Sequence, residues 1–154
     1  MANECIVIDT QLLVLLAAGN ASRSIIRRHK RLYPKYDSRA YDLLIRILSG
    51  ARKVLVTPGV LTETSNLIRQ TAEPDRKCVM AAFRDLIDGA DELHVASKVV
   101  ARSDVFIRLG FADAALLETD AASVLLTDDL HLYLAAERAG RLVMNFNHAR
   151  EADR

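Results

Sequence analysis

The sequence contains few of the features that would point to a disulfide-rich, zinc-binding or multidomain protein. It has 2 cysteines among 154 residues, and Cys5 and Cys78 lack the spacing of a zinc site or a CxxC motif. We therefore expect reduced thiols in the core of a cytoplasmic protein. With only 6 glycines and 3 prolines, the chain has no stretch typical of a flexible linker. We expect a single domain over residues 1–150 and a short tail at 151–154.

An excess of charge of one sign is missing as well. The 21 basic and 20 acidic side chains give a formal net charge of +1, so any electropositive surface that binds nucleic acid must be local. The residues that precede the first apolar stretch lack the basic character of a secretory signal. The apolar run from Leu12 to Ala18 is far too short to cross a bilayer, so we expect no membrane contact.

Hydrophobic residues make up 51% of the chain and fall into short apolar runs that alternate with helical patterns. This alternation predicts a single α/β domain with a central, mostly parallel sheet of about five strands flanked by helices, in a Rossmann-like three-layer arrangement. Right-handed crossovers then place the ends of the first, second and fourth strands at one edge of the sheet. The expected strands are 5–8, 53–56, 93–95, 123–126 and 142–144, and a helix is expected over 97–109.

Acidic residues recur at this predicted edge. Asp9 follows the first strand, Asp113 opens a helix before the fourth strand, and Asp128 and Asp129 follow the fourth strand. Glu63 lies in the helix after the second strand, three residues after Val60, where it interrupts an apolar face and needs partners. Ligands of open α/β sheets bind beyond the carboxyl ends of the strands, so acids at this edge have special weight.

Each acid also has a simpler structural explanation. Asp9 can cap the helix that follows it, and Asp113 lies near a helix N-terminus, where the helix dipole stabilises a negative charge. Thr127 or Asp128 is expected to cap the helix after the fourth strand. Only the joint placement of the acids favours a functional site.

Four carboxylates that fold into one poorly solvated cleft raise one another's pKa values, and a divalent cation resolves this conflict. Oxygen ligands without histidine or cysteine select Mg²⁺ or Mn²⁺. Such an ion activates water and offsets charge on a phosphate, which indicates hydrolysis of a phosphodiester.

Four ordered segments resemble the successive acidic motifs of PIN-domain nucleases, and the resemblance covers nearly the whole chain. It implies a PIN-like fold and a ribonuclease site in which Asp9, Glu63, Asp113 and Asp129 are catalytic and hold Mg²⁺ or Mn²⁺. The segments are Val7-Ile8-Asp9-Thr10, Thr57-Pro58-Gly59-Val60-Leu61-Thr62-Glu63, Gly110-Phe111-Ala112-Asp113-Ala114-Ala115-Leu116-Leu117 and Val124-Leu125-Leu126-Thr127-Asp128-Asp129.

The resemblance also assigns supporting residues. Thr127 is expected to steady the site by hydrogen bonding, with Asp128 as a helix cap or outer group and Thr10 beside Asp9. One departure is Gln11, which stands where the family commonly has Asn or Ser. The spacing from Asp113 to Asp129 is also tighter than usual, which suggests a trimmed connection.

Many small bacterial members of this family are toxins of toxin–antitoxin modules, so the resemblance implies a cytoplasmic toxin with a protein antitoxin. Leucine and isoleucine are abundant between Ile25 and Leu48, which suggests a surface for a homodimer.

The one dense basic segment suggests how RNA would bind. Its candidate RNA-binding residues are Arg27, Arg28, Lys30 and Arg31, with Arg23, His29 and Lys35 nearby and two interleaved tyrosines, Tyr33 and Tyr36, that could stack on unpaired bases. A solvated helix face is the alternative explanation.

Two other functions compete with the nuclease. A non-catalytic RNA- or protein-binding module that kept the PIN-like fold gains some support from Gln11. A receiver-like domain also has a Mg²⁺-binding acid cluster, but it fits poorly because Val56 leads into Thr57-Pro58 and Met144 into Asn145, where that family has an aspartate and a lysine.

Overall fold

Parallel strands form one sheet in the computed structural model, which describes residues 3–154; Met1 and Ala2, at the start of the predicted domain, lie outside the described residues. The sheet is 5-stranded, with the order β3-β2-β1-β4-β5, and every pair of neighbours is parallel. The strands are β1 (Cys5–Ile8), β2 (Lys53–Val56), β3 (Asp91–Glu92), β4 (Val124–Thr127) and β5 (Val143–Asn145).

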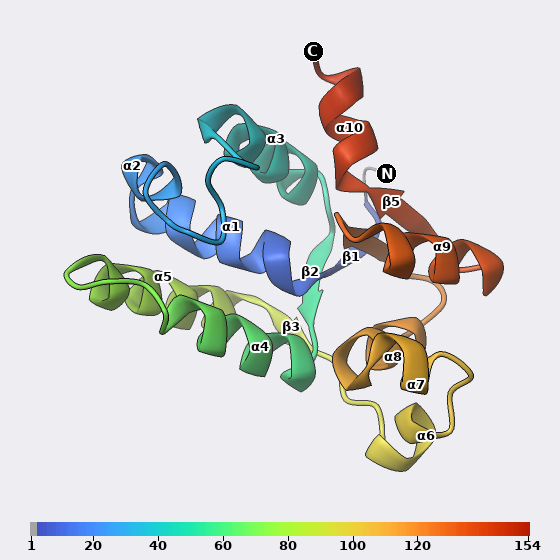
Figure 1. Cartoon of the computed structure of the whole chain (residues 1–154). Coiled ribbons are helices and arrows are strands. Elements are labelled where there is room, and N and C mark those ends of the chain that lie inside the picture. Colours follow the sequence, from blue (N-terminus) through green and yellow to red (C-terminus); the bar gives the residue numbers. More distant parts are fainter. Residues whose placement is uncertain (1–2) are drawn as a thin grey trace.

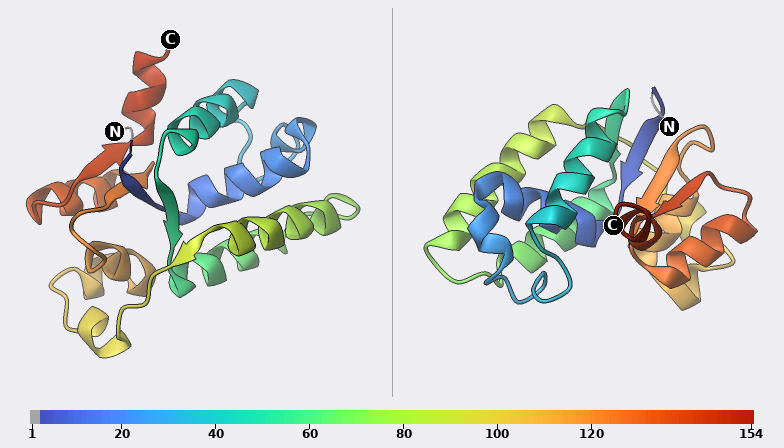
Figure 2. Two further views of the ribbon diagram at one scale, coloured as in Figure 1. Left: turned by 180° about the vertical axis from the view of Figure 1, so that it is seen from behind. Right: turned by 90° about the horizontal axis from the view of Figure 1, so that it is seen from above.

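Helices cover both faces of this sheet. Figure 1 and Figure 2 show α1 to α5 gathered on one side and α6 to α9 on the other. The helices are α1 (Thr10–Ala21), α2 (Arg23–Ile26), α3 (Ser38–Ser49), α4 (Pro58–Ile68), α5 (Asp75–Gly89), α6 (Ser97–Ala101), α7 (Phe106–Leu109), α8 (Phe111–Leu117), α9 (Leu130–Arg138) and α10 (Phe146–Ala152). The predicted fold class, a single α/β domain with a parallel sheet of about five strands in a three-layer, PIN-like arrangement, is confirmed.

The core is built around β1 and α1. All but one of the first ten residues of α1 are buried, because this helix lies between the sheet and the helices α3 to α5. Gly19 permits the closest approach, since a Cβ atom there would overlap the ring of Tyr41 on α3. This dense packing fixes the start of α1, and therefore Asp9 and Thr10, against the end of β1.

Two predicted elements differ from the structure. The third strand is Asp91–Glu92 instead of 93–95, because its pairing with β2 ends where Leu93 donates a hydrogen bond to the carbonyl of Val56, 2.8 Å away. The single helix expected over 97–109 is two short helices, α6 and α7. They are separated by a turn in which the Phe106 amide donates to the carbonyl of Ser103, 3.1 Å away.

Smaller corrections concern individual residues. Cys78, predicted in the core, is exposed on α5, whereas Cys5 is partly buried. The fourth and the last strand each begin and end one residue later than predicted. Helix α10 runs through Ala152, into the segment assigned to the tail.

Within residues 3–154, no helix has the length and apolar character needed to cross a bilayer.

Candidate active site

The strand order has a switch point between β1 and β4. The connection after β1 leads toward β2 and the connection after β4 leads toward β5, so the chain leaves these two neighbours in opposite directions. Such a switch point at the carboxyl edge is where α/β proteins bind ligands. Asp9 follows β1 here, and Asp128 and Asp129 follow β4.

Asp9 is buried at this switch point and held by two donors. Its Oδ1 accepts a hydrogen bond from the Thr10 amide at 2.7 Å, and its Oδ2 accepts one from the Thr127 hydroxyl at 2.6 Å. Burial raises the pKa of Asp9 to about 6; the two bonds lower it, and the charges of Asp128 and Asp129 raise it. Asp9 is therefore both the N-cap residue of α1 and a member of an acidic cluster.

Asp113 approaches the same cluster from α8. Gly110, with a φ of +88°, ends α7 and lets the chain turn into α8, which places Asp113 in the first turn of that helix. Burial raises the pKa of Asp113 to about 7, and the charges of Asp9, Asp129 and Glu63 add to the rise. Because repulsion between charges falls with distance, this effect places the four acids in one neighbourhood.

Glu63 reaches the cluster from α4, but not from its buried face as predicted. The buried stripe of α4 is Val60, Thr64 and Ile68, at spacings of four, so Glu63 projects from the flank of the helix and is exposed. Its Oε1 accepts a hydrogen bond from the Thr10 hydroxyl at 2.7 Å. That bond ties the start of α1 to α4 across the site.

The two acids after β4 differ from the prediction. Asp129, not Thr127 or Asp128, caps α9, because its Oδ1 accepts hydrogen bonds from the amides of His131 and Leu132 at 2.8 and 3.1 Å. The Thr127 hydroxyl accepts a bond from the Asp129 amide at 3.0 Å while it donates to Asp9, so it links the ends of β1 and β4.

Asp128 is buried and does not cap α9. Its Oδ2 accepts hydrogen bonds from the Tyr36 hydroxyl and from Lys35 Nζ, the latter at 2.8 Å. Burial and the charge of Asp128 raise the pKa of Tyr36, which therefore remains a protonated donor. No sequence pattern indicates this contact, because Lys35 and Asp128 are more than ninety positions apart.

The acidic cluster has many carboxylate oxygens, but its side chains do not form a complete metal-coordination sphere. No group of three or more His, Cys, Asp or Glu side chains in residues 3–154 is positioned to hold a metal ion. Metal binding therefore requires the carboxylates to move closer together than they lie here. No ion pair within the same residues involves Asp9, Glu63, Asp113 or Asp129, so they keep their charges unpaired.

Most side chains of the basic segment, residues 23–35, contact other parts of the chain. Arg28 pairs with Asp75 at 2.6 Å, and Arg31 donates to Gln70. His29 is buried against the Thr71 hydroxyl at 2.8 Å, and burial lowers its pKa, so it is not an exposed cation. Of the candidate RNA-binding residues, Arg27 and Lys30 are exposed and make neither an ion pair nor a side-chain hydrogen bond within residues 3–154.

Tyrosine stacking on bases is restricted by burial. Tyr36 is 1% exposed and packs against Phe146, so the predicted stacking by Tyr36 is wrong, whereas Tyr33 is 60% exposed. Gln11 binds this segment and not the acids: its Nε2 donates to the Arg31 carbonyl at 2.5 Å. Gln11 thus fastens the basic segment to the first turn of α1, beside the site.

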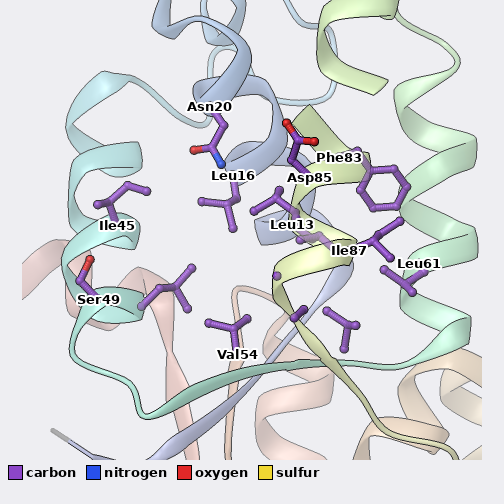
Figure 3. A pocket seen from close by; sticks show the side chains of 15 residues that line it. Leu13, Leu16, Asn20, Ile45, Ser49, Val54, Leu61, Phe83, Asp85 and Ile87 are labelled. Carbon is purple, nitrogen blue, oxygen red and sulfur yellow. The ribbon is translucent and has the colours of Figure 1, made fainter. Parts of the chain in front are cut away.

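A separate hollow of about 300 Å³ lies between α1, α3, α5 and β2, and none of the predicted catalytic residues lines it. Figure 3 shows Leu13, Leu16 and Val54 around it, with the polar side chains of Asn20 and Asp85 at one end. Ile45 and Leu48, from the predicted dimer region, also line it, whereas Ile25, Ile26, Leu32 and Leu44 are buried in the core of the chain itself.

No known protein-family model matches this chain, and no curated protein matches it either.

Proposed function

We propose that the chain is a metal-dependent endoribonuclease that hydrolyses RNA phosphodiester bonds, as its resemblance to PIN-domain nucleases implies. The observation that carries the proposal is the placement of the acids where β1 and β4 end side by side: Thr127 binds Asp9 and Thr10 binds Glu63. In agreement with this placement, burial and the charges of Asp9, Asp129 and Glu63 raise the pKa of Asp113. Acids that repel one another at the ligand-binding edge of a sheet are costly for stability. A function that uses their combined negative charge explains why they gather there.

The donor set suits Mg²⁺ or Mn²⁺. Asp9, Glu63, Asp113 and Asp129 offer carboxylate oxygens, which hard divalent cations prefer, and a cation relieves the repulsion that raises their pKa values. When bound, such an ion activates water and offsets the charge that develops on the phosphate.

The surrounding residues orient these acids. Thr127 donates to Asp9 Oδ2 and Thr10 donates to Glu63 Oε1, so each hydroxyl limits the rotation of one carboxylate. The amides at the start of α9 hold Asp129 by its Oδ1. Carboxylates restrained in this way need less reorganisation when substrate arrives.

The partners and location belong to the same proposal. The family resemblance favours a cytoplasmic toxin that is restrained by a protein antitoxin and forms a homodimer. Sedimentation of the purified protein measures the oligomeric state. Co-expression with the product of a neighbouring small gene tests the antitoxin: we expect the pair to purify together and RNA cleavage to stop.

Cleavage of a labelled RNA tests the enzymatic proposal. The wild type is expected to cut RNA in Mg²⁺ or Mn²⁺ and to be inactive in EDTA. Asp9→Asn is expected to lower the cleavage rate more than about 100-fold, because it removes a proposed metal ligand. Asp75→Asn, a partly buried acid paired with Arg28 outside the site, is the matched control and should retain full activity. Unchanged cleavage in EDTA and in Asp9→Asn would reject the proposal. A DNA strand of the same sequence tests substrate class.

A non-catalytic RNA- or protein-binding module is the alternative, favoured by the observation that the acids do not lie as a finished ligand shell. Calorimetric titration with Mn²⁺ separates the two functions. The nuclease requires a saturable site that Asp113→Asn abolishes, whereas a binding module needs no such site.

A further inference from the structure

Lys35 is a cation that the fold brings to the acidic site, and a second cation, Arg150, lies 5.2 Å from the centre of the neighbouring Tyr36 ring. Among residues 3–154, Lys35 is the basic side chain that forms an ion pair with an acid following β1 or β4. Its partner, Asp128, lies close enough to Asp9 for its charge to raise the pKa of that acid. The Lys35 ammonium therefore lies at the border of the cluster formed by Asp9, Glu63, Asp113 and Asp129.

The position of Lys35 is fixed by its contact with the buried carboxylate of Asp128. The side chain of Asp128 is only 4% exposed, and its Oδ2 receives the Tyr36 hydroxyl as well as Lys35 Nζ. Tyr36 is itself buried against Phe146, and its ring lies 5.3 Å from Lys35 Nζ. The lysine is thus held by a carboxylate that cannot easily turn away.

The part of Lys35 that does not contact Asp128 remains exposed to solvent. Its side chain is 47% exposed, and an ammonium group has three donors, of which Asp128 Oδ2 takes one. The remaining donors are available to a ligand. Because the ammonium is already positioned, binding an anion there costs less side-chain entropy than it would at a free lysine.

An RNA strand that approaches the four acids meets repulsion between its phosphates and the carboxylates. One fixed positive charge at the border of the cluster counters that repulsion and defines where a phosphate can rest. We propose that Lys35 binds a backbone phosphate of the substrate beside the acidic site, and that Asp128 and Tyr36 are the positioning residues that hold it there.

This inference rests on the proposed nuclease function, and RNA binding and RNA cleavage test the two separately. Lys35→Met removes the charge but keeps the length of the side chain. We expect it to raise KM for a short RNA about tenfold, the usual value of one charge-assisted hydrogen bond, while kcat changes less than about threefold. Lys35→Arg keeps the charge and should restore KM to within about threefold of the wild type.

Lys53→Met is the matched control. Lys53 is also an exposed lysine paired with an aspartate, at 2.9 Å from Asp91, but it lies at the start of β2, away from the carboxyl edge. Its KM should equal that of the wild type. A KM for Lys35→Met equal to that of Lys53→Met would overturn the inference, and so would a loss confined to kcat or melting temperature.

A direct measurement of RNA binding tests the Lys35 contact even if the wild type does not cleave RNA. In the Asp113→Asn background with EDTA, Lys35→Met should weaken binding of single-stranded RNA and reduce its salt dependence by a slope of about 0.7, as the loss of one phosphate contact predicts. Weakened binding without any cleavage by the wild type would reject the nuclease while supporting the phosphate contact. Cleavage by the wild type with unaltered binding in Lys35→Met would reject the contact alone.

Discussion

Asp75 and Asp113 both lie in the first turn of a helix, but their carboxyl groups behave oppositely. Each is the acid in the first turn of its helix, Asp75 in α5 and Asp113 in α8. Arg28 lowers the pKa of Asp75 through a hydrogen bond, whereas burial and neighbouring acids raise the pKa of Asp113 to about 7. A helix N-terminus favours a negative charge in both places, so the difference arises from the neighbours. Asp75 has a cation partner, and Asp113 has three more acids.

Removal of each carboxylate should give the largest contrast. Asp113→Asn is expected to abolish saturable Mn²⁺ binding and to lower the rate of RNA cleavage more than about 100-fold, because it removes a proposed ligand. Asp75→Asn should leave both within twofold or so of the wild type, since its partner is Arg28. Calorimetry and a cleavage assay measure the two effects. Equal losses in both variants would show that the comparison has no functional meaning.

The pH dependence of stability should show the next largest difference. The folded-state pKa values of Asp9 and Asp113, about 6 and about 7, lie above the unfolded value of 3.8. The native state therefore holds more protons than the unfolded state between these values, and in EDTA the free energy of unfolding falls as pH rises from 5 to 8. In Asp113→Asn, the part of this decrease in the free energy of unfolding that Asp113 causes should be absent.

The size of this share follows from the half-buried position of Asp113. We expect about 2 kcal/mol at pH 8, after a discount for screening by solvent. Urea unfolding of both proteins at pH 5 and pH 8 measures it. Added Mg²⁺ should flatten the wild-type curve, because a bound cation stabilises the ionised acids. A wild-type protein that is more stable at pH 8 than at pH 5 in EDTA would contradict the raised pKa values.

Asp75 should give the smallest effect, and with the opposite sign. Its pKa lies below the ordinary value, so its contribution to stability is present above the unfolded pKa and is lost as pH falls through the folded pKa. Asp75→Asn is therefore expected to lower the melting temperature slightly at pH 7 and not at all at low pH. Thermal unfolding at both pH values checks this. A higher melting temperature for the variant at pH 7 would show that the pair with Arg28 is unfavourable.

Sequence patterns predicted the parts of this fold that depend on local order. The strands 5–8 and 53–56 and the Asp9 cap of α1 all follow from neighbouring residues, and the structure has each of them. The edge strand β3 was misplaced because its position depends on where β2 stops offering partners, which neighbouring residues do not encode. The break between α6 and α7 was missed because the apolar spacing continues across Ser103.

The site was predictable to the same extent. The order of strands brings Asp9 and Asp129 to one edge, and this follows from the alternating pattern and right-handed crossovers. The pairing of Asp128 with Lys35 and Tyr36 depends on how a long irregular segment folds back onto the sheet edge. No local rule describes that path. The exposed position of Glu63 likewise depends on which side of α4 the core selects.

The outermost strand β3 also bears on how this chain meets other copies of itself. It consists only of Asp91 and Glu92, both exposed, and an open sheet margin is where foreign strands most readily add. An edge strand of two residues, whose charged side chains already pair with Lys53 and His94, leaves an incoming strand little to pair with. The β3 edge of the sheet therefore disfavours the strand addition that leads to fibres.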